Sequence, residues 1–366
     1  MTPDAKAQLI KRAAAELGFD RVGFAPASPT PHAAYYREWL SRGYAGSMAY
    51  LHRNVPMRED VSNILPGARS VICTAIRYRI PDGESRPRAA ESEREAQASN
   101  LRSEREAQAS APPSEPGARA TGFPAGETPR ASSNTPAPLG RIARYALADD
   151  YHIILRRRLE ALIARMRAEI PDTFDARPFV DTGPILERDL AAAAGLGWIG
   201  KNTLLMHERL GSYLFLAEII TTLDLPPDAP ATDHCGSCTR CLDACPTHAF
   251  PRPYVLDASR CISYFTIEHR GDIPPEHHAA IGDWVYGCDI CQEVCPFNHK
   301  APPTADAQLA QPRIPAALPL ADLVQLTSWQ YRTLTRNSAT QRATRKMWHR
   351  NAAIALANGE ATQPTN

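Results

Sequence analysis

The strongest constraint on this chain of 366 residues is a set of eight cysteines between positions 235 and 295. The first four follow the pattern C-x2-C-x2-C-x3-C and precede a proline, which is typical of bacterial ferredoxins that bind [4Fe–4S] clusters. In such proteins three thiolates of a run bind one cube, and the fourth binds a neighbouring cube. The four residues are Cys235, Cys238, Cys241 and Cys245.

A second, shorter run of Cys288, Cys291 and Cys295 also precedes a proline. Val285 stands where this run would need its fourth ligand, and Cys261, between the two runs, can supply it. The sequence therefore predicts two [4Fe–4S] clusters. The predicted ligands are Cys235, Cys238, Cys241 and Cys295 for the first cluster, and Cys288, Cys291, Cys245 and Cys261 for the second.

Zinc and disulfide bonds are the alternative uses of these cysteines. Two C-x2-C pairs could bind zinc, but a zinc site needs four ligands and has no use for the repeated C-x3-C-P. Disulfides are disfavoured because the N-terminus mixes charged and apolar residues and has no secretory signal. The ninth cysteine, Cys73, lies in the strand-like stretch SVICTAI and is expected to pack in a core.

Charge and hydropathy limit the remaining function classes. The formal net charge is +1, so any contact with nucleic acid has to be a local patch. No stretch is apolar over the length needed to cross a bilayer, and we expect a cytoplasmic protein without membrane contact. The length allows a sizeable core and two domains.

Helical and strand patterns alternate before the cysteines, which predicts an α+β or α/β first domain. A helix is expected to begin at Thr182, with Pro184 in its first turn. The other expected helices cover 3–17, 35–41 and 150–170, and the expected strands cover 21–25, 70–78, 177–181 and 211–223.

Two stretches are interpreted as having no chemical role. Residues 82–138 contain Leu101 and Phe123 as their only large apolar residues, and SEREAQAS occurs in them twice, so we expect a disordered insertion. The glycines of 195–200 match GxGxxG, but a helical stretch precedes them where a dinucleotide site needs a strand. We therefore reject nucleotide binding.

Several further stretches, taken with the cysteines, resemble the epoxyqueuosine reductase family, which acts last in queuosine biosynthesis on tRNA. The resemblance covers nearly all of the chain outside the insertion, which the usual family pattern lacks. The chain also ends before the HEAT-repeat tail of longer members. The matching segments are MREDVSNILPGARSVI (57–72), RIARYALADDYH (141–152), VDTGPILER (180–188), GWIGKNTLL (197–205), GSYLFLAEI (211–219), CISYFTIEHRG (261–271) and RNAAIA (350–355).

The resemblance implies a cobalamin cofactor in addition to the two clusters. Electrons from an external donor of flavodoxin or ferredoxin type pass one at a time to cobalt, which removes the epoxide oxygen of epoxyqueuosine in the tRNA anticodon. The oxygen leaves as water. The D-x-H-x-x-G signature of a histidine lower ligand is absent, in agreement with base-off cobalamin. We expect a monomer.

The predicted fold class is therefore α+β. It comprises a cobalamin-binding α/β domain with a central sheet, a two-cluster ferredoxin-like domain and a short helical C-terminal region. The predicted boundaries are 1–81 with 139–228 for the catalytic domain, 82–138 for the insertion, 229–300 for the cluster domain, and 301–366 for the connector and basic C-terminal region.

Asp181 matches the family's catalytic acid. A carboxyl that donates a proton at neutral pH needs a raised pKa, which burial under the corrin ring would provide. Without the resemblance, a helix cap is the commoner role of such an aspartate.

Other residues are assigned by their position in the matched segments or beside the cluster ligands. Arg58 and Arg144 are expected at the amides or phosphate of the cofactor, and Leu205 and Leu216 against the corrin. Their alternatives are surface arginines and core leucines. Arg260, Asp289 and Tyr264 are expected beside the second cluster, the one nearer cobalt, where Tyr264 could merely shield the cube.

The C-terminal region carries a local basic patch. Between Leu323 and Gly359 there is no Asp or Glu. Such a stretch predicts a contact with tRNA phosphates, and the alternative is a solvated face. Its six positive residues are Arg332, Arg336, Arg342, Arg345, Lys346 and Arg350.

Two other functions use similar cofactors. Reductive dehalogenases combine cobalamin and clusters, but they are typically exported with a twin-arginine signal, which is absent here. A ferredoxin-type electron carrier would leave nearly two hundred residues before the clusters without a purpose.

Overall fold

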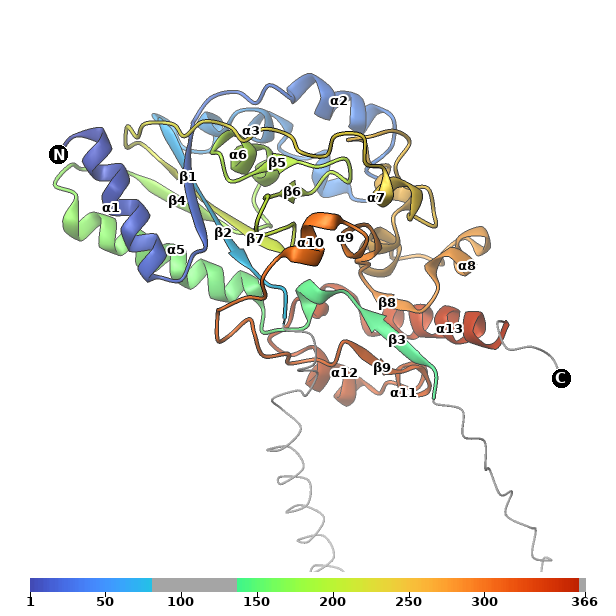
Figure 1. Ribbon diagram of the computed structural model, residues 1–366. Coiled ribbons are helices and arrows are strands. Elements are labelled where there is room, and N and C mark those ends of the chain that lie inside the picture. Colours follow the sequence, from blue (N-terminus) through green and yellow to red (C-terminus); the bar gives the residue numbers. More distant parts are fainter. Residues whose placement is uncertain (81–136, 362–366) are drawn as a thin grey trace, which may run out of the picture.

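The computed structural model of the protein describes residues 1–80 and 137–361. The predicted insertion lies outside the described residues except for its last two positions, so its disorder stays a prediction. Figure 1 shows a layered sheet region on one side of the molecule, and the cysteine-bearing loops and C-terminal helices on the other.

A four-stranded sheet forms the centre of the first region, as predicted. Its order is β1-β2-β7-β4, and every neighbouring pair is antiparallel. The antiparallel pairing makes this region α+β, and the α/β description is wrong for its sheet. The strands are β1 (Arg21–Pro26), β2 (Ser70–Arg77), β7 (Leu214–Thr221) and β4 (Ala176–Phe179).

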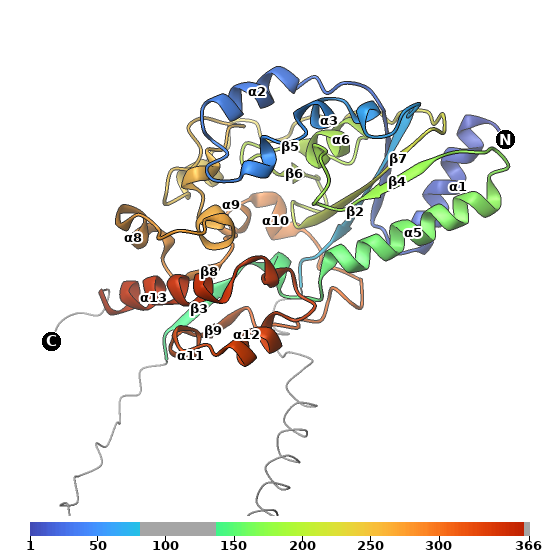
Figure 2. The same cartoon turned by 180° about the vertical axis from the view of Figure 1, so that it is seen from behind.

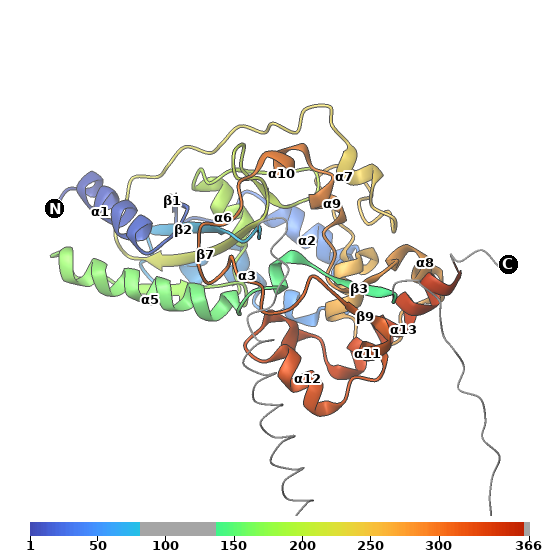
Figure 3. The same cartoon turned by 60° about the horizontal axis from the view of Figure 1, so that its bottom comes forward.

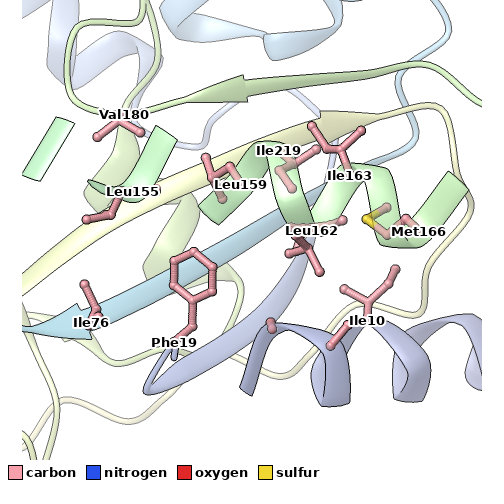
Figure 4. Packing of buried hydrophobic residues seen from close by; sticks show 14 of the residues in the cluster. Ile10, Phe19, Ile76, Leu155, Leu159, Leu162, Ile163, Met166, Val180 and Ile219 are labelled. Carbon is pink, nitrogen blue, oxygen red and sulfur yellow. The ribbon is translucent and has the colours of Figure 1, made fainter. Parts of the chain in front are cut away.

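Helices α1 (Pro3–Glu16) and α5 (Tyr151–Glu169) cover one face of this sheet. Both were predicted from apolar periodicity, and Thr2 caps α1 through a hydrogen bond from the amide of Ala5. Figure 4 shows side chains of both helices meeting those of β2 and β7. Leu159 is fully buried there, so truncation to alanine would cost about 2–5 kcal/mol.

The opposite face packs against α6 (Glu187–Ala193) and α3 (Val55–Glu59), as the view from behind shows (Figure 2). The predicted helix start at Thr182 is wrong, because the segment from Asp181 to Leu186 forms a turn and α6 begins at Glu187. Cys73 is fully buried on this face, as predicted.

The glycine-rich stretch that mimics a nucleotide motif forms a β-hairpin of β5 (Trp198–Ile199) and β6 (Leu205–Met206). It follows α6, and Gly195 has a φ of +72° at the end of that helix. The arrangement is helix, turn and hairpin, and this stretch therefore lacks the strand, turn and helix of a dinucleotide-binding motif.

A second sheet joins three of the predicted regions. Strand β3 (Leu139–Ile142) pairs in parallel with β8 (Trp284–Tyr286) and antiparallel with β9 (Ala317–Pro319). Helices α11 (Leu320–Val324), α12 (Ser328–Thr335) and α13 (Arg345–Ala361) gather beside this sheet (Figure 3). Backbone hydrogen bonds therefore join the predicted catalytic domain to the segments beyond the predicted boundaries at 228/229 and 300/301.

The remaining helices are short and lie mostly around the cysteines. None of the helices in 1–80 and 137–361 is long and apolar enough to span a membrane. The short helices are α2 (Ala33–Ser41), α7 (Arg240–Asp243), α8 (His278–Ile281), α9 (Ile290–Glu293) and α10 (Pro296–Lys300).

A candidate cluster and cofactor site

The predicted ligands of the first cluster come together in the structure. The thiol of Cys241, on α7, is within electrostatic range of Cys235, Cys238 and Cys295. Lys201 fixes the loop around them, because its Nζ donates to the carbonyls of Gly236 and Cys238 at 2.7 and 3.0 Å. Cys238 is exposed, so this first group lies at the protein surface.

The predicted ligands of the second cluster form the other group. Cys288 interacts with Cys261 and Cys245, and Cys291, on α9, interacts with Cys288, Cys261 and also Cys241 of the first group. The two groups are therefore neighbours, as electron transfer between two clusters requires.

All nine cysteines are free thiols, so the disulfide alternative is wrong. Among the described residues, no three His, Cys, Asp or Glu side chains are gathered tightly enough for a single metal ion. A [4Fe–4S] cube binds its four ligands at four separate iron corners. It therefore accepts thiolates that lie farther apart than the ligands of a single metal ion. An all-thiolate donor set in two groups of four suits iron–sulfur cubes.

A cleft of about 1140 Å³, open to solvent, lies between the sheet region and the second cysteine group. Leu205 and Leu216 line it as predicted, together with Leu204 and Leu214. Its opposite wall contains Asp289 and all four thiols of the second group, Cys245, Cys261, Cys288 and Cys291. The cleft thus combines an apolar surface of leucines with the thiols of the second cysteine group.

A buried hydrogen-bond network holds the second group against the end of β7. The amide of Ser212 donates to Oδ1 of Asn298 at 2.7 Å, and Ser212 Oγ donates to Gln292 Oε1 at 2.9 Å. Gln292 in turn donates to Asp289 at 3.1 Å. Because every member is buried, the network fixes α9 relative to the sheet.

Asp181 follows β4 in a left-handed turn with a φ of +55°. Its amide donates to Oε1 of Glu187 at 2.5 Å, and its carboxylate lies 3.2 Å from Nε2 of His152. The other ring nitrogen of His152 lies 2.7 Å from Asp150. The alternative role of Asp181 as a helix cap is wrong, since Leu186 holds the N-cap position of α6.

The ion pair changes the protonation expected of Asp181. Burial by itself raises the pKa of Asp181, but the hydrogen bond and charge of His152 outweigh it and lower the pKa. Burial lowers the pKa of His152, whereas hydrogen bonds to Asp150 and Asp181 raise it to about 9. In this arrangement the proton at neutral pH belongs to the His152–Asp181 pair, and the raised pKa expected of Asp181 under a corrin ring stays a prediction.

The turn from Asp181 to Leu186, called the acid turn from here on, lies at the rim of the cleft. Arg188 and Tyr145 both line the cleft, and both interact electrostatically with Asp181. Tyr151 connects the turn to the sheet, because its ring stacks on Phe215 with centroids 4.2 Å apart. Asp181 and the second cysteine group thus border one space from different sides.

The two predicted cofactor arginines have main-chain partners. Arg58 donates to two carbonyls of 183–185, at 3.4 and 3.2 Å, and so braces the acid turn. The amide of Arg144 donates to Asp289 at 2.7 Å, and its guanidinium lies 5.7 Å from the Tyr213 ring centroid. Neither arginine lines the cleft, and their contact with a cofactor stays a prediction.

Arg260 is exposed and lies outside the cleft lining. Tyr264 is buried, and its hydroxyl donates to Ser47 Oγ at 2.8 Å while accepting from the Ser47 amide at 2.9 Å. Tyr264 therefore connects the N-terminal region to the loops that carry the cysteines.

The basic C-terminal residues divide into two kinds. Arg332, Arg336 and Lys346 are exposed, whereas Arg350 donates to the carbonyls of Phe265, His269 and Gly271. Burial lowers the pKa of Arg350 to about 10. Arg350 is a clamp on the loop after Cys261, and its expected contact with phosphate finds no support in this geometry.

Arg342 links the basic patch to the acid turn. Its guanidinium forms a bidentate ion pair with Glu268 at 2.8 and 2.9 Å and lies 5.5 Å from the Tyr50 ring centroid. Arg342 also interacts electrostatically with Asp181. Arg342 is therefore the basic C-terminal residue that interacts with the turn carrying Asp181.

Comparisons with known proteins agree with these features. Residues 234–298 match the family described as 4Fe-4S double cluster binding domain, and 122–182 match the family described as Epoxyqueuosine reductase QueG, DUF1730. The epoxyqueuosine reductase of Pseudomonas aeruginosa is 39% identical over 99% of this chain and 88% of its own length. This chain belongs to the epoxyqueuosine reductase family. The Gloeobacter violaceus relative is 38% identical over 99% of this chain and 98% of its own.

Solved structures of epoxyqueuosine reductases share the fold. One, in complex with an epoxyqueuosine-modified tRNA-Tyr stem loop, has a TM-score of 0.78 and 29% identity, covering 98% of this chain and 82% of that chain. Another, from Bacillus subtilis, has a TM-score of 0.77 and 28% identity over 98% of this chain and 82% of that chain. Its catalytic aspartate loop is swung out of the active site.

Membership of this family confirms the predicted reductase activity and the predicted iron–sulfur clusters. The chain is an oxidoreductase acting on epoxyqueuosine, and the dehalogenase and electron-carrier alternatives are set aside.

Sequence reasoning missed His152, Glu187 and Glu218 as parts of the site. His152 ends a matched segment, but its contact with Asp181 depends on how α5 packs. Glu218 did carry a signal, since it is the only charged residue in the strand sequence GSYLFLAEIITTL (211–223). A lone charge in a buried strand is rarely accidental.

Proposed function

We propose that the protein reduces epoxyqueuosine to queuosine in the anticodon of tRNA, with base-off cobalamin in the cleft and two [4Fe–4S] clusters beside it. The observation that carries the proposal is the cleft itself, which has the second cysteine group on one side and the His152–Asp181 pair at its rim. An electron source and a proton source thus border one space that is open to solvent.

The residues of the cleft fit a corrin. Leu204, Leu205, Leu214 and Leu216 offer an apolar surface for a flat ring, and Asn202 and Ser212 offer polar groups at its edge for amide side chains. When bound, cobalamin would supply a strongly reducing metal centre for removal of the epoxide oxygen. The second cysteine group lies against this space, whereas the first group is absent from its lining, which supports electron flow from first cluster to second.

The reaction balance requires protons as well as electrons. Reduction of an epoxide to an alkene breaks two C–O bonds and consumes two electrons and two protons, and the oxygen leaves as water. The chain's own groups can deliver one proton, because His152 keeps its proton up to about pH 9 and shares it with Asp181. Asp181 has the more accessible side chain of the pair, 56% against 31% for His152, so it is the group that a substrate can reach.

The substrate proposal rests on the basic patch and on the relative. A tRNA stem loop is bound to a solved epoxyqueuosine reductase, and here Arg332, Arg336 and Lys346 are exposed in the same C-terminal region as Arg342, which interacts electrostatically with Asp181. The patch would hold phosphates, and the modified base would enter the cleft. We also propose an external one-electron donor, a monomeric state and a cytoplasmic location.

The test is turnover with defined components. Protein reconstituted anaerobically with iron, sulfide and cobalamin is mixed with a low-potential reductant and an epoxyqueuosine-containing tRNA stem loop. Queuosine should form only when cobalamin and both clusters are loaded. Equal turnover without cobalamin would contradict the proposal, and an unmodified stem loop serves as the control for substrate.

A further inference from the structure

Glu218 is a buried carboxyl with no donor in the described structure. It lies in the middle of β7, is fully buried, and neither of its oxygens has a hydrogen-bond donor. It faces the α6 side of the sheet and pairs in register with Cys73 on β2. An ionised carboxylate in such a place would cost several kcal/mol, so Glu218 must hold a proton.

The group that faces Glu218 is the carboxyl of Glu187, at the start of α6. Helix α6 packs on β7, and two carboxyl groups that face each other away from water share a proton, since only a protonated one can donate to the other. The same Glu187 accepts the Asp181 amide at 2.5 Å. The contacts therefore run from Glu218 through Glu187 to the turn that carries the acid.

We propose that Glu218 and Glu187 share one proton and act as a positioning pair for Asp181. The O–H of Glu218 donates to the Glu187 carboxylate, and Glu187 holds the Asp181 amide in the left-handed turn. This inference rests on the proposed role of Asp181. The catalytic aspartate loop of the Bacillus subtilis relative is found swung out, and a loop that can leave its site needs a contact that keeps it in.

The charges around the pair agree with one shared proton. Burial raises the pKa of Glu187 to about 7, helped by the charge of Asp181 and opposed by Arg188. Burial raises the pKa of Glu218 further, and the charge of Glu187 adds to this. Cys73 stays neutral because burial raises its pKa too. Near neutral pH, the pair thus keeps the Glu218 proton while Glu187 ionises.

Substitutions at Glu218 separate positioning from mere burial. Glu218→Gln keeps the shape and supplies a permanent N–H donor to Glu187, so turnover at pH 7 should stay within about threefold of wild type. Turnover of Glu218→Gln should also persist to higher pH than turnover of wild type. At high pH the Glu218–Glu187 pair of wild type loses its shared proton, whereas glutamine keeps its N–H. Glu218→Leu removes the donor, and kcat should fall 10- to 100-fold with unchanged KM and iron content.

Two readouts are independent of turnover. Infrared spectroscopy should show a protonated carboxyl band in wild type that is lost in Glu218→Gln. The control is Glu59→Gln, which changes a buried glutamate paired with Arg37 and should leave the band in place. Hydrogen exchange of the Asp181 amide should accelerate in Glu218→Leu and stay slow in Glu218→Gln. A missing band, or equal exchange in both variants, would overturn the positioning pair.

The Glu218 variants together with Asp181→Asn distinguish failure of the positioning pair from failure of the proposed function. If Asp181→Asn remains active, the acid assignment is wrong, and the band and exchange results still decide the pair. If Asp181→Asn is inactive while Glu218→Leu keeps full kcat, the pair has no positioning role.

Discussion

Asp181→Asn is the most informative single change, because it removes one charge and one exchangeable acid while keeping the shape of the side chain. The left-handed turn tolerates Asn as well as Asp, and the amide hydrogen bond to Glu187 involves only the backbone. Folding and cluster loading should therefore be preserved. Turnover should fall by about 10²–10⁴-fold, equivalent to about 3–5.5 kcal/mol of barrier.

The structure also gives the expected shift at His152. Its pKa of about 9 depends on two carboxylates acting against burial, and Asp181→Asn leaves only Asp150. With one carboxylate left to act against the same burial, the pKa of His152 falls, and the protonated fraction at pH 8 drops below the nine-tenths or so of wild type. Because the folded pKa is raised, the stabilisation from this ion pair is complete below pH 6.5 and is lost as pH rises through about 9.

Asp150→Asn is the matched control. It removes the other carboxylate from His152, and Asn still caps α5. Both variants should lower the His152 pKa in an NMR titration of imidazole-labelled protein with oxidised clusters. Only Asp181→Asn should lose most of its turnover at pH 6.5, measured by mass spectrometry of nucleosides from the tRNA stem loop. Turnover within threefold of wild type in fully loaded Asp181→Asn would refute the assignment.

Three other predictions test the clusters, the hydrogen bonds of Asn351 on α13 and the basic patch. Reconstituted protein should bind about eight iron and eight sulfide, and Cys261→Ala should bind about four while keeping the first cluster; zinc without iron would contradict this. Asn351→Leu removes the side-chain amide that donates to two buried carbonyls at 2.8 and 2.9 Å. The free energy of unfolding, measured in urea titrations, should fall by about 2–5 kcal/mol, and an unchanged value would refute the hydrogen-bond argument. Reversing Arg332, Arg336 and Lys346 to Glu should weaken binding of the tRNA stem loop and reduce the slope of log affinity against log salt by about 2–3, whereas reversal of exposed arginines on α5 should not.

The amino-acid sequence by itself determined the cysteine chemistry and most helices and strands. Metal-ligand spacing is local, so the pattern before Pro246 indicates cubes without any knowledge of the fold. Apolar periodicity is equally local, which explains why α1 and α5 lie where the periodicity predicts. The grouping of Cys295 with the first run and Cys245 with the second was also predictable, because the motif itself exchanges its fourth ligand.

Only the tertiary structure decided the proton chemistry. A carboxyl's pKa depends on charges and burial contributed by distant segments, and Asp181 meets His152 only because α5 packs against β4. For the same reason Arg350, a basic residue by sequence, became a clamp on main-chain carbonyls. Glu218 and Glu187 are 31 positions apart, and β7 and α6 bring them together on one face of the sheet. Local patterns determine which residues can do chemistry, and packing determines which of them share a proton.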